Sequence, residues 1–252
     1  MYEDNETLSD LNNLKLWDND RSGYRSLKDY STLSEEGNIE VVFRHIEKRL
    51  IEEIRKADMV FGCVAWLTSE PILNALAEKK GAEIIIQKED FLRPDFRLPN
   101  QKEKKRRQHL RRLYSRIRAI EGHLFEGTWL EPLWHYQGAF AEAVRCVGNN
   151  NKDKQPACPR AHHKFVLFAR YEKQPSIHDD ILGEHTLLVP ESVWTGSFNF
   201  TKNAGYSLEN ALIVRDKRIV SAYVNEFAQI AAVSEPLDWK TNWAEPQHFI
   251  GT

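Results

Sequence analysis

The fold is decided by residues 159–168, PRAHHKFVLF, together with residues 194–200, WTGSFNF, later in the chain. The apolar run that ends the first stretch predicts a short buried strand. Side chains of a strand repeat every second residue, so His162 and Lys164 are expected on one face of it. This places an imidazole and an ammonium group together at the start of the strand.

The second stretch predicts a strand that breaks into a turn at Gly196. The small polar residues Ser197 and Asn199 follow the glycine at alternate positions, so they also share a face. If the two strands are neighbours, an imidazole, an ammonium, a hydroxyl and an amide converge. Such a set can bind an oxyanion and attack it.

Both stretches resemble the motif of the phospholipase D superfamily, in a single-motif, nuclease-like form. That motif combines His-x-Lys, an Asp after four further residues, a downstream Gly-Ser-x-Asn and a later Glu. The matching residues are His162, Lys164, Gly196, Ser197, Asn199 and Glu209. The resemblance covers about residues 40–90 and 155–230. It implies an α/β (α+β) fold, with a mixed β-sheet flanked by helices on both faces.

The resemblance also implies the chemistry of the site. His162 attacks phosphorus and forms a phosphohistidine, and a second histidine protonates the leaving oxygen. The non-bridging oxygens are bound by Lys164, Ser197 and Asn199, while Glu209 fixes the tautomer of His162. This scheme uses no metal ion and no cofactor.

The chain holds one copy of the motif, and no second His-x-Lys or Gly-Ser-x-Asn occurs. Family members with one copy complete the site by pairing two subunits. We therefore expect a homodimer in which His162 from each chain reaches the same phosphate.

One motif element is missing, because Ala169 occupies the position of the Asp. Either Glu172, Asp179 or Asp180 substitutes for it, or the activity is reduced. A descendant that binds nucleic acid without cleaving it is therefore an alternative.

Composition narrows the class of protein. The chain has 252 residues and a formal net charge of −2, so any polyanion site must be local. The acidic N-terminus, the lack of a long apolar run and three cysteines indicate a cytoplasmic protein without a membrane partner. A zinc site at Cys146, Cys158 and the two histidines is disfavoured by the cysteine spacing.

The chain divides into an N-terminal arm (1–38), a phospholipase D-like catalytic domain (39–233) and a C-terminal tail (234–252). Within the domain, apolar patterns predict strands near 39–43, 59–67, 83–87, 165–168 and 211–214, and helices near 46–58 and 71–80. Residues 170–193 read as an exposed insertion that returns through two short strands, 187–189 and 193–195. A last helix packs on the sheet through Ile219, Ala222, Tyr223 and Phe227.

A basic helical insertion is expected at about 92–158, with an amphipathic helix at 102–118. Its strongly basic face is either simply solvated or contacts a phosphate backbone. The candidate nucleic-acid-binding residues are Lys104, Lys105, Arg106, Arg107, Arg111 and Arg112. Farther along, Trp129, Trp134, His135, Tyr136 and Phe140 read as core more readily than as base-stacking platforms.

These features together predict a metal-independent phosphodiesterase, endonuclease-like, that cleaves DNA or RNA. The alternatives are a phospholipid phosphodiesterase, which requires an apolar entry or membrane anchor, and a catalytically reduced nucleic-acid-binding module.

Overall fold

The structure is a computed structural model that describes residues 10–93, 100–120, 142–151, 159–175 and 184–239. The predictions for Asp179, Asp180, Cys158 and the aromatic residues between 129 and 140 lie outside the described residues. The elements in chain order are η1 (Leu11–Asn13), β1 (Lys15–Asp18), β2 (Gly23–Ser26), β3 (Thr32–Leu33), β4 (Ile39–Val42), α2 (Ile46–Lys56), β5 (Met59–Val64), α3 (Glu70–Ala77), β6 (Gly81–Gln87), η2 (Asp90–Leu92), α4 (Gln101–Tyr114), β7 (Val144–Val147), β8 (Lys164–Pro175), β9 (Glu184–Gly196), η5 (Lys202–Tyr206), β10 (Ala211–Val214) and α6 (Lys217–Ala232).

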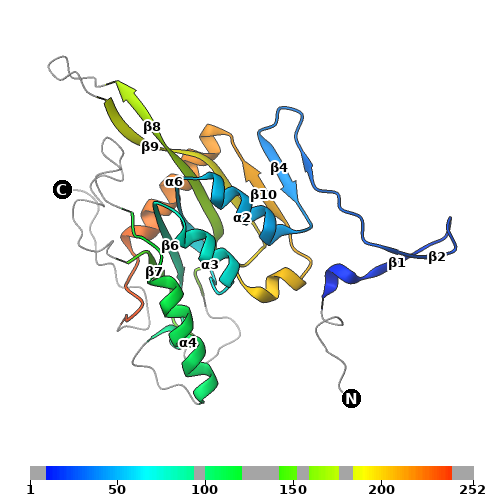
Figure 1. Ribbon diagram of the computed structural model, residues 1–252, viewed down its shortest axis with the longest axis horizontal. Helices are drawn as coiled ribbons and strands as arrows, with labels where there is room; N and C mark the ends of the chain where they lie inside the picture. The colour runs from blue at the N-terminus through cyan, green and yellow to red at the C-terminus, as the bar shows by residue number, and fades with distance from the viewer. Residues whose placement is uncertain (1–9, 94–99, 121–141, 152–158, 176–183, 240–252) are drawn as a thin grey trace.

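The body of the protein is an eight-stranded mixed sheet in the order β3-β4-β10-β9-β8-β5-β6-β7. Strands β5, β6 and β7 run parallel to one another, and the other neighbours pair antiparallel. Figure 1 shows α2 and α3 on one face of this sheet and α6 on the other. The predicted mixed sheet with helices on both faces is therefore confirmed.

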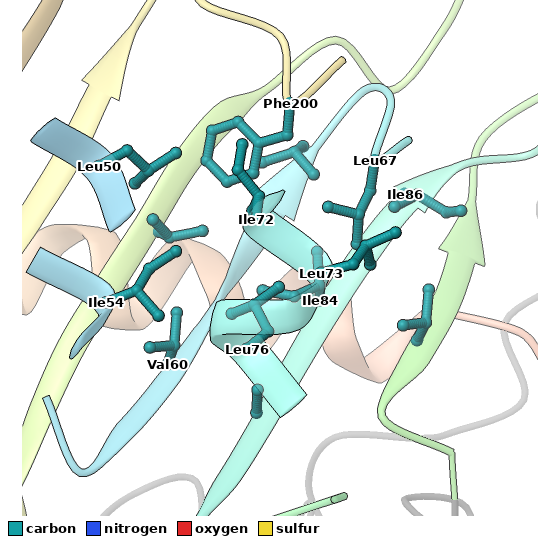
Figure 2. Packing of buried hydrophobic residues seen from close by; sticks show 14 of the residues in the cluster. Leu50, Ile54, Val60, Leu67, Ile72, Leu73, Leu76, Ile84, Ile86 and Phe200 are labelled. Atoms are coloured by element: carbon teal, nitrogen blue, oxygen red, sulfur yellow. The ribbon is translucent and has the colours of Figure 1, made fainter. Parts of the chain in front are cut away.

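The face under α2 and α3 holds the larger hydrophobic core. Amphipathic α2 directs Leu50 and Ile54 inward, and α3 contributes Ile72. These side chains meet Val60 of β5 and Ile84 of β6, as Figure 2 shows. Fully burying one such side chain stabilises the fold by about 1.5–3 kcal/mol. The same core therefore holds β5 and β6 against α2 and α3.

The opposite face is covered by α6, whose Phe227 packs on Phe61 with ring centroids 5.0 Å apart. Nearer the start of β8, the ring of Tyr223 in α6 packs on the ring of Phe165, with centroids 4.9 Å apart. Asp216 caps the helix by accepting hydrogen bonds from the backbone N–H groups of Arg218 and Ile219. The helix therefore begins where β10 ends and runs back across the sheet.

The segment that the sequence presents as an insertion is a long hairpin. Strands β8 and β9 stay paired from Phe165–Thr195 out to Pro175–Glu184, with an irregularity between Phe168 and Ala169. The two short strands expected within 187–195 are one continuous strand, β9. Figure 1 shows the hairpin projecting beyond the body of the sheet.

Both flanking regions carry structure of their own. In the arm, β1 and β2 form a separate two-stranded sheet that lies away from the body in Figure 1. At the other end, Glu235 pairs with Cys146 through backbone hydrogen bonds and forms a buried ion pair with Lys88. Trp239 is also buried. The described part of the tail thus covers β7, next to the loop that follows β6.

Candidate active site

The histidine segment is held from two neighbouring strands. The backbone N–H of Ala161 donates to Oε1 of the buried Gln87, at the end of β6, at 2.7 Å. The backbone N–H of Ala65, just after β5, donates to the carbonyl of His163 at 2.8 Å. His162 therefore lies between two fixed backbone positions.

Lys164 lies directly against the imidazole of His162. Its Nζ is 3.1 Å from Nδ1 and 3.3 Å from Nε2 of the ring, and it donates to the His162 carbonyl at 3.0 Å. Partial burial, followed by the positive charges of Lys164, Arg160 and His163, lowers the pKa of His162 below 6.5. The ring is therefore neutral at pH 7, as a nucleophile at phosphorus must be.

Lys164 itself is under two opposing influences. Partial burial lowers its pKa, and the carboxylate of Glu209 acts in the opposite direction. Glu209 therefore lies close enough to Lys164 to help keep the ammonium charged.

Trp66 forms one wall of the site. Its ring meets that of His162 edge-on, with centroids 5.6 Å apart and an interplanar angle of 81°. The indole Nε1–H donates to Oε1 of Glu89 at 3.0 Å, which fixes the ring. The functional interpretation of the sequence missed Trp66, Glu89 and Gln87. The sequence offered one indication of their role. Trp66 and Gln87 lie at the ends of the expected strands 59–67 and 83–87, and Glu89 follows the second strand by two residues.

Gly196 is required by a close backbone approach. A Cβ at this position would lie 2.3 Å from the carbonyl oxygen of Asn210 and 2.8 Å from Cα of Ala211. This approach brings Ser197 to Glu209. The hydroxyl of Ser197 donates to the Glu209 carboxylate and accepts from the backbone N–H of Asn210 at 3.0 Å.

The expected hydrogen bond between His162 and Glu209 does not form between these two described residues. Glu209 accepts from Ser197 instead, and the ring nitrogens of His162 face Lys164. This corrects the expected contact within one chain. The carboxylate lies in the site but orients the serine hydroxyl.

The Gly-Ser-x-Asn segment is anchored by its aromatic residues, since Phe198 and Phe200 are fully buried. The backbone N–H of Phe200 donates to the carbonyl of Trp66 at 3.2 Å. Phe200 and Leu67 also form an isolated parallel β-bridge. The amide oxygen of Asn199 is buried and has no hydrogen-bond partner among the described residues. The segment after Trp66 thus links the histidine and serine parts of the motif.

The neighbouring His163 faces α6. Its Nε2 is 3.4 Å from the carboxylate of Glu226, and its ring meets Phe165 edge-on at 5.6 Å. Adjacent residues of an extended chain point to opposite sides. Of the two histidines, His162 is therefore the one directed at Lys164.

At the missing Asp, Ala169 is fully buried. Beside it, the N–H of Asp58 donates to the Ala169 carbonyl at 3.0 Å, and Asp58 Oδ2 accepts from the N–H of Tyr171 at 3.1 Å. The expected substitute Glu172 lies on the projecting hairpin, eight positions after Lys164. The position of the missing Asp, Ala169, is itself five positions after Lys164, so Glu172 lies three positions farther out, about 10 Å along the strand at ~3.3 Å per residue. Glu172 therefore does not occupy the place of that Asp.

The basic helix α4 docks beside the site. Leu110, Leu113 and Tyr114 are buried, and the Tyr114 hydroxyl donates to the carbonyl of Leu67 at 2.6 Å. Figure 1 shows α4 next to α3, extending away from the sheet. The helix is therefore tied to the same segment that links the two halves of the motif.

The six candidate nucleic-acid-binding residues divide into two groups. Arg107 and Arg111 are half-buried and donate to the carbonyl oxygens of Arg93 and Leu92. The other four are exposed on α4: Lys104, Lys105, Arg106 and Arg112. The first group stabilises the C-terminal end of η2, and the second presents positive charge to solvent.

Residues 50–231 match the family described as "Cardiolipin synthase, PLD-like domain". The chain belongs to the phospholipase D superfamily. The "Uncharacterized protein L381" of Acanthamoeba polyphaga mimivirus is 29% identical to this superfamily member over 223 residues, which cover 84% of this chain and 71% of the viral protein.

Two solved structures are similar at 14% identity. The match with NucT from Helicobacter pylori covers 79% of this chain and 98% of the NucT chain, with a TM-score of 0.43. The second is Nuc from Salmonella typhimurium, described as a phospholipase D family member. The match covers 81% of this chain and 98% of the Nuc chain, with a TM-score of 0.44.

Two further properties concern only the described residues of this superfamily member. Among the described helices, none combines the length and apolar character needed to cross a bilayer. Within the same part of the chain, no three His, Cys, Asp or Glu side chains are grouped as metal ligands.

Proposed function

We propose that the protein is a phosphodiesterase that cleaves DNA or RNA through a phosphohistidine at His162, without a metal ion. The observation that carries this proposal is the position of Lys164 Nζ, 3.1 Å from Nδ1 of His162. An ammonium so close keeps the imidazole neutral and can bind a phosphate oxygen. Membership of the phospholipase D superfamily supports the same chemistry.

In the first step, a ring nitrogen of His162 forms a bond to phosphorus and the bond to the leaving oxygen breaks. The leaving oxygen takes its proton from His162 of a second copy. An anionic phosphate between two imidazoles favours protonation of one of them. In the second step, that histidine removes a proton from water. The water oxygen attacks phosphorus, and the P–N bond breaks.

The remaining motif residues stabilise the transition state. Lys164 and the amide of Asn199 donate to the non-bridging oxygens, where negative charge accumulates. Ser197 donates as well once its hydroxyl turns from Glu209. Donors of this kind are each worth on the order of 10²–10³ in rate.

A second copy is part of the proposal because one chain carries one His162 motif. Large apolar side chains are also exposed beside the site, at Leu208 and Leu212, on either side of Glu209. A contiguous apolar patch marks an interface, and we propose that these two side chains form part of one. A homodimer would cover it and bring the second imidazole to the phosphate.

Nucleic acid is the proposed substrate because α4 presents Lys104, Lys105, Arg106 and Arg112 to solvent. The whole chain has a net charge of −2, so these cations stand out against an otherwise acidic protein. Neutralising backbone phosphates with such side chains releases counterions and strengthens binding.

The deciding experiment is cleavage of single-stranded and double-stranded DNA and RNA in the presence of EDTA. We expect cleavage to persist, and a phosphohistidine to be detected by mass spectrometry after rapid quenching at high pH. His162→Ala should abolish both, whereas the adduct should still form in His163→Gln.

Three outcomes would contradict the proposal. Loss of cleavage in EDTA would indicate a metal-dependent mechanism. Binding without cleavage would favour a nucleic-acid-binding module. Hydrolysis of phospholipid vesicles with no activity on nucleic acid would favour a lipid phosphodiesterase.

A further inference from the structure

A cavity of about 590 Å³ lies beside His162, on the side of the sheet covered by α6. The residues that matter for its chemistry are Val147, Asn149, Arg160, His162, Ile230 and Val233. Ligand sites for small molecules measure about 300–1,000 Å³, so this cavity is larger than a phosphate group requires. Both His162 and its neighbour His163 line the cavity, so a ligand in it would lie next to the residue that is proposed as the nucleophile.

The lining divides into an apolar wall and a polar rim. Ile230 and Val233 come from the end of α6, and Val147 from the end of β7. The rim is polar, with the guanidinium of Arg160 and the amide of Asn149, whose Nδ2 donates to the carbonyl of Pro159 at 3.4 Å. No carboxylate belongs to the described lining residues. The cavity therefore suits a flat ring with hydrogen-bonding edges that is attached to an anion.

The polar rim is fixed by the buried Gln87. Its Nε2 donates to the carbonyl of Asn149 at 2.6 Å, while its Oε1 accepts from the N–H of Ala161. Between these contacts, Gly148 has φ +96°, and a Cβ there would lie 2.7 Å from Oε1 of Gln87. The loop that carries Asn149 and the strand entry that carries His162 are thus joined by one side chain.

We propose that this cavity binds the nucleobase next to the phosphate that His162 attacks, and that it prefers purines. This inference rests on the proposed nuclease function. Arg pairs with O6 and N7 of guanine, and Asn pairs with N6 and N7 of adenine. Both pairings require N7, which pyrimidines lack. The aliphatic wall contacts the face of the ring.

The test measures binding, so that it does not depend on catalysis. In a His162→Ala background, affinities are compared for oligo-dA, oligo-dG, oligo-dT and an abasic oligomer of equal length. We expect the purine oligomers to bind about tenfold more tightly than both oligo-dT and the abasic oligomer. Val233→Trp should remove this difference by filling the cavity, while affinity for the abasic oligomer stays the same.

Two further variants keep the result interpretable. Asn225→Trp places the same bulk on the exposed side of α6 and should leave the preference intact. Arg160 is exposed, so Arg160→Ala should leave folding intact. This variant should weaken the binding of oligo-dG more than the binding of oligo-dA.

Equal affinity for abasic and purine oligomers would overturn the base pocket while leaving the nuclease proposal standing. A purine preference that survives Val233→Trp would overturn it as well. If none of the oligomers binds, both proposals fail together.

Discussion

At the scale of single residues, the protonation state of His162 decides whether the proposed chemistry can start. Partial burial first, and then the charge of Lys164, lower its pKa below 6.5. Because the folded-state pKa is lowered, the ring stays neutral above that value and gains its proton only as pH falls through it. We expect an NMR titration of His162 to have its midpoint below 6.5.

Removing the neighbouring charge tests the cause of this shift. Lys164→Met removes the positive charge but retains most of the bulk, so the pKa of His162 should rise toward 6.5 without reaching it, because burial remains. A midpoint that does not change in Lys164→Met would show that the ammonium does not act on the ring.

The sequence could identify residues whose chemistry is carried by local spacing. His162 and Lys164 are two positions apart, and spacing alone places them together. Trp66 and Glu89 could not be found in this way, because they approach His162 only through the pairing of β5 with β8 and β6. Their contribution depends on tertiary contacts between distant strand ends.

At the scale of elements, the same contrast appears in the strands. The apolar runs in β5 and β6 predicted buried strands, and those strands are buried on both faces. The outer part of the β8–β9 hairpin was missed, because residues 170–175 mix charged, polar and aromatic side chains without an apolar run. Pairing with β9 holds that part of the chain extended, and of the side chains described there only Tyr171 packs against the core on the α6 side.

The basic helix α4 is the element whose role can be tested most directly. Reversing the exposed charges with Lys104→Glu, Lys105→Glu and Arg112→Glu should weaken nucleic-acid binding at low salt. It should also reduce the slope of log affinity against log salt by roughly 0.7–0.9 for each phosphate that is no longer neutralised. Fluorescence anisotropy across a salt series measures both quantities.

A second variant, with two charges reversed elsewhere, separates binding from a general charge effect. Lys217→Glu and Arg218→Glu alter exposed charges at the start of α6. This helix follows the end of β10 that lies opposite the end paired with Gly196. We expect little change in affinity or slope for this pair. If the α4 variant binds as the wild type does at low salt, its basic face is merely solvated.

At the scale of the whole molecule, one chain has half of the proposed site. His162, Lys164, Ser197 and Glu209 lie together within it, but the leaving oxygen still needs a second imidazole. The exposed Leu208 and Leu212 lie on either side of Glu209 in the chain. A two-fold axis near the site would bury these residues against the same patch of a partner.

Leu208→Asp with Leu212→Asp should therefore produce a monomer. At a two-fold interface each new carboxylate lies close to its own copy, so electrostatic repulsion adds to the reduced burial of apolar surface. Sedimentation velocity measures the mass, circular dichroism checks the fold, and the EDTA-resistant assay should show that cleavage disappears together with dimerisation. Tyr24→Asp changes an apolar residue that is 74% exposed on the β1–β2 hairpin and should have no such effect. A wild-type monomer that cleaves nucleic acid would contradict the shared site.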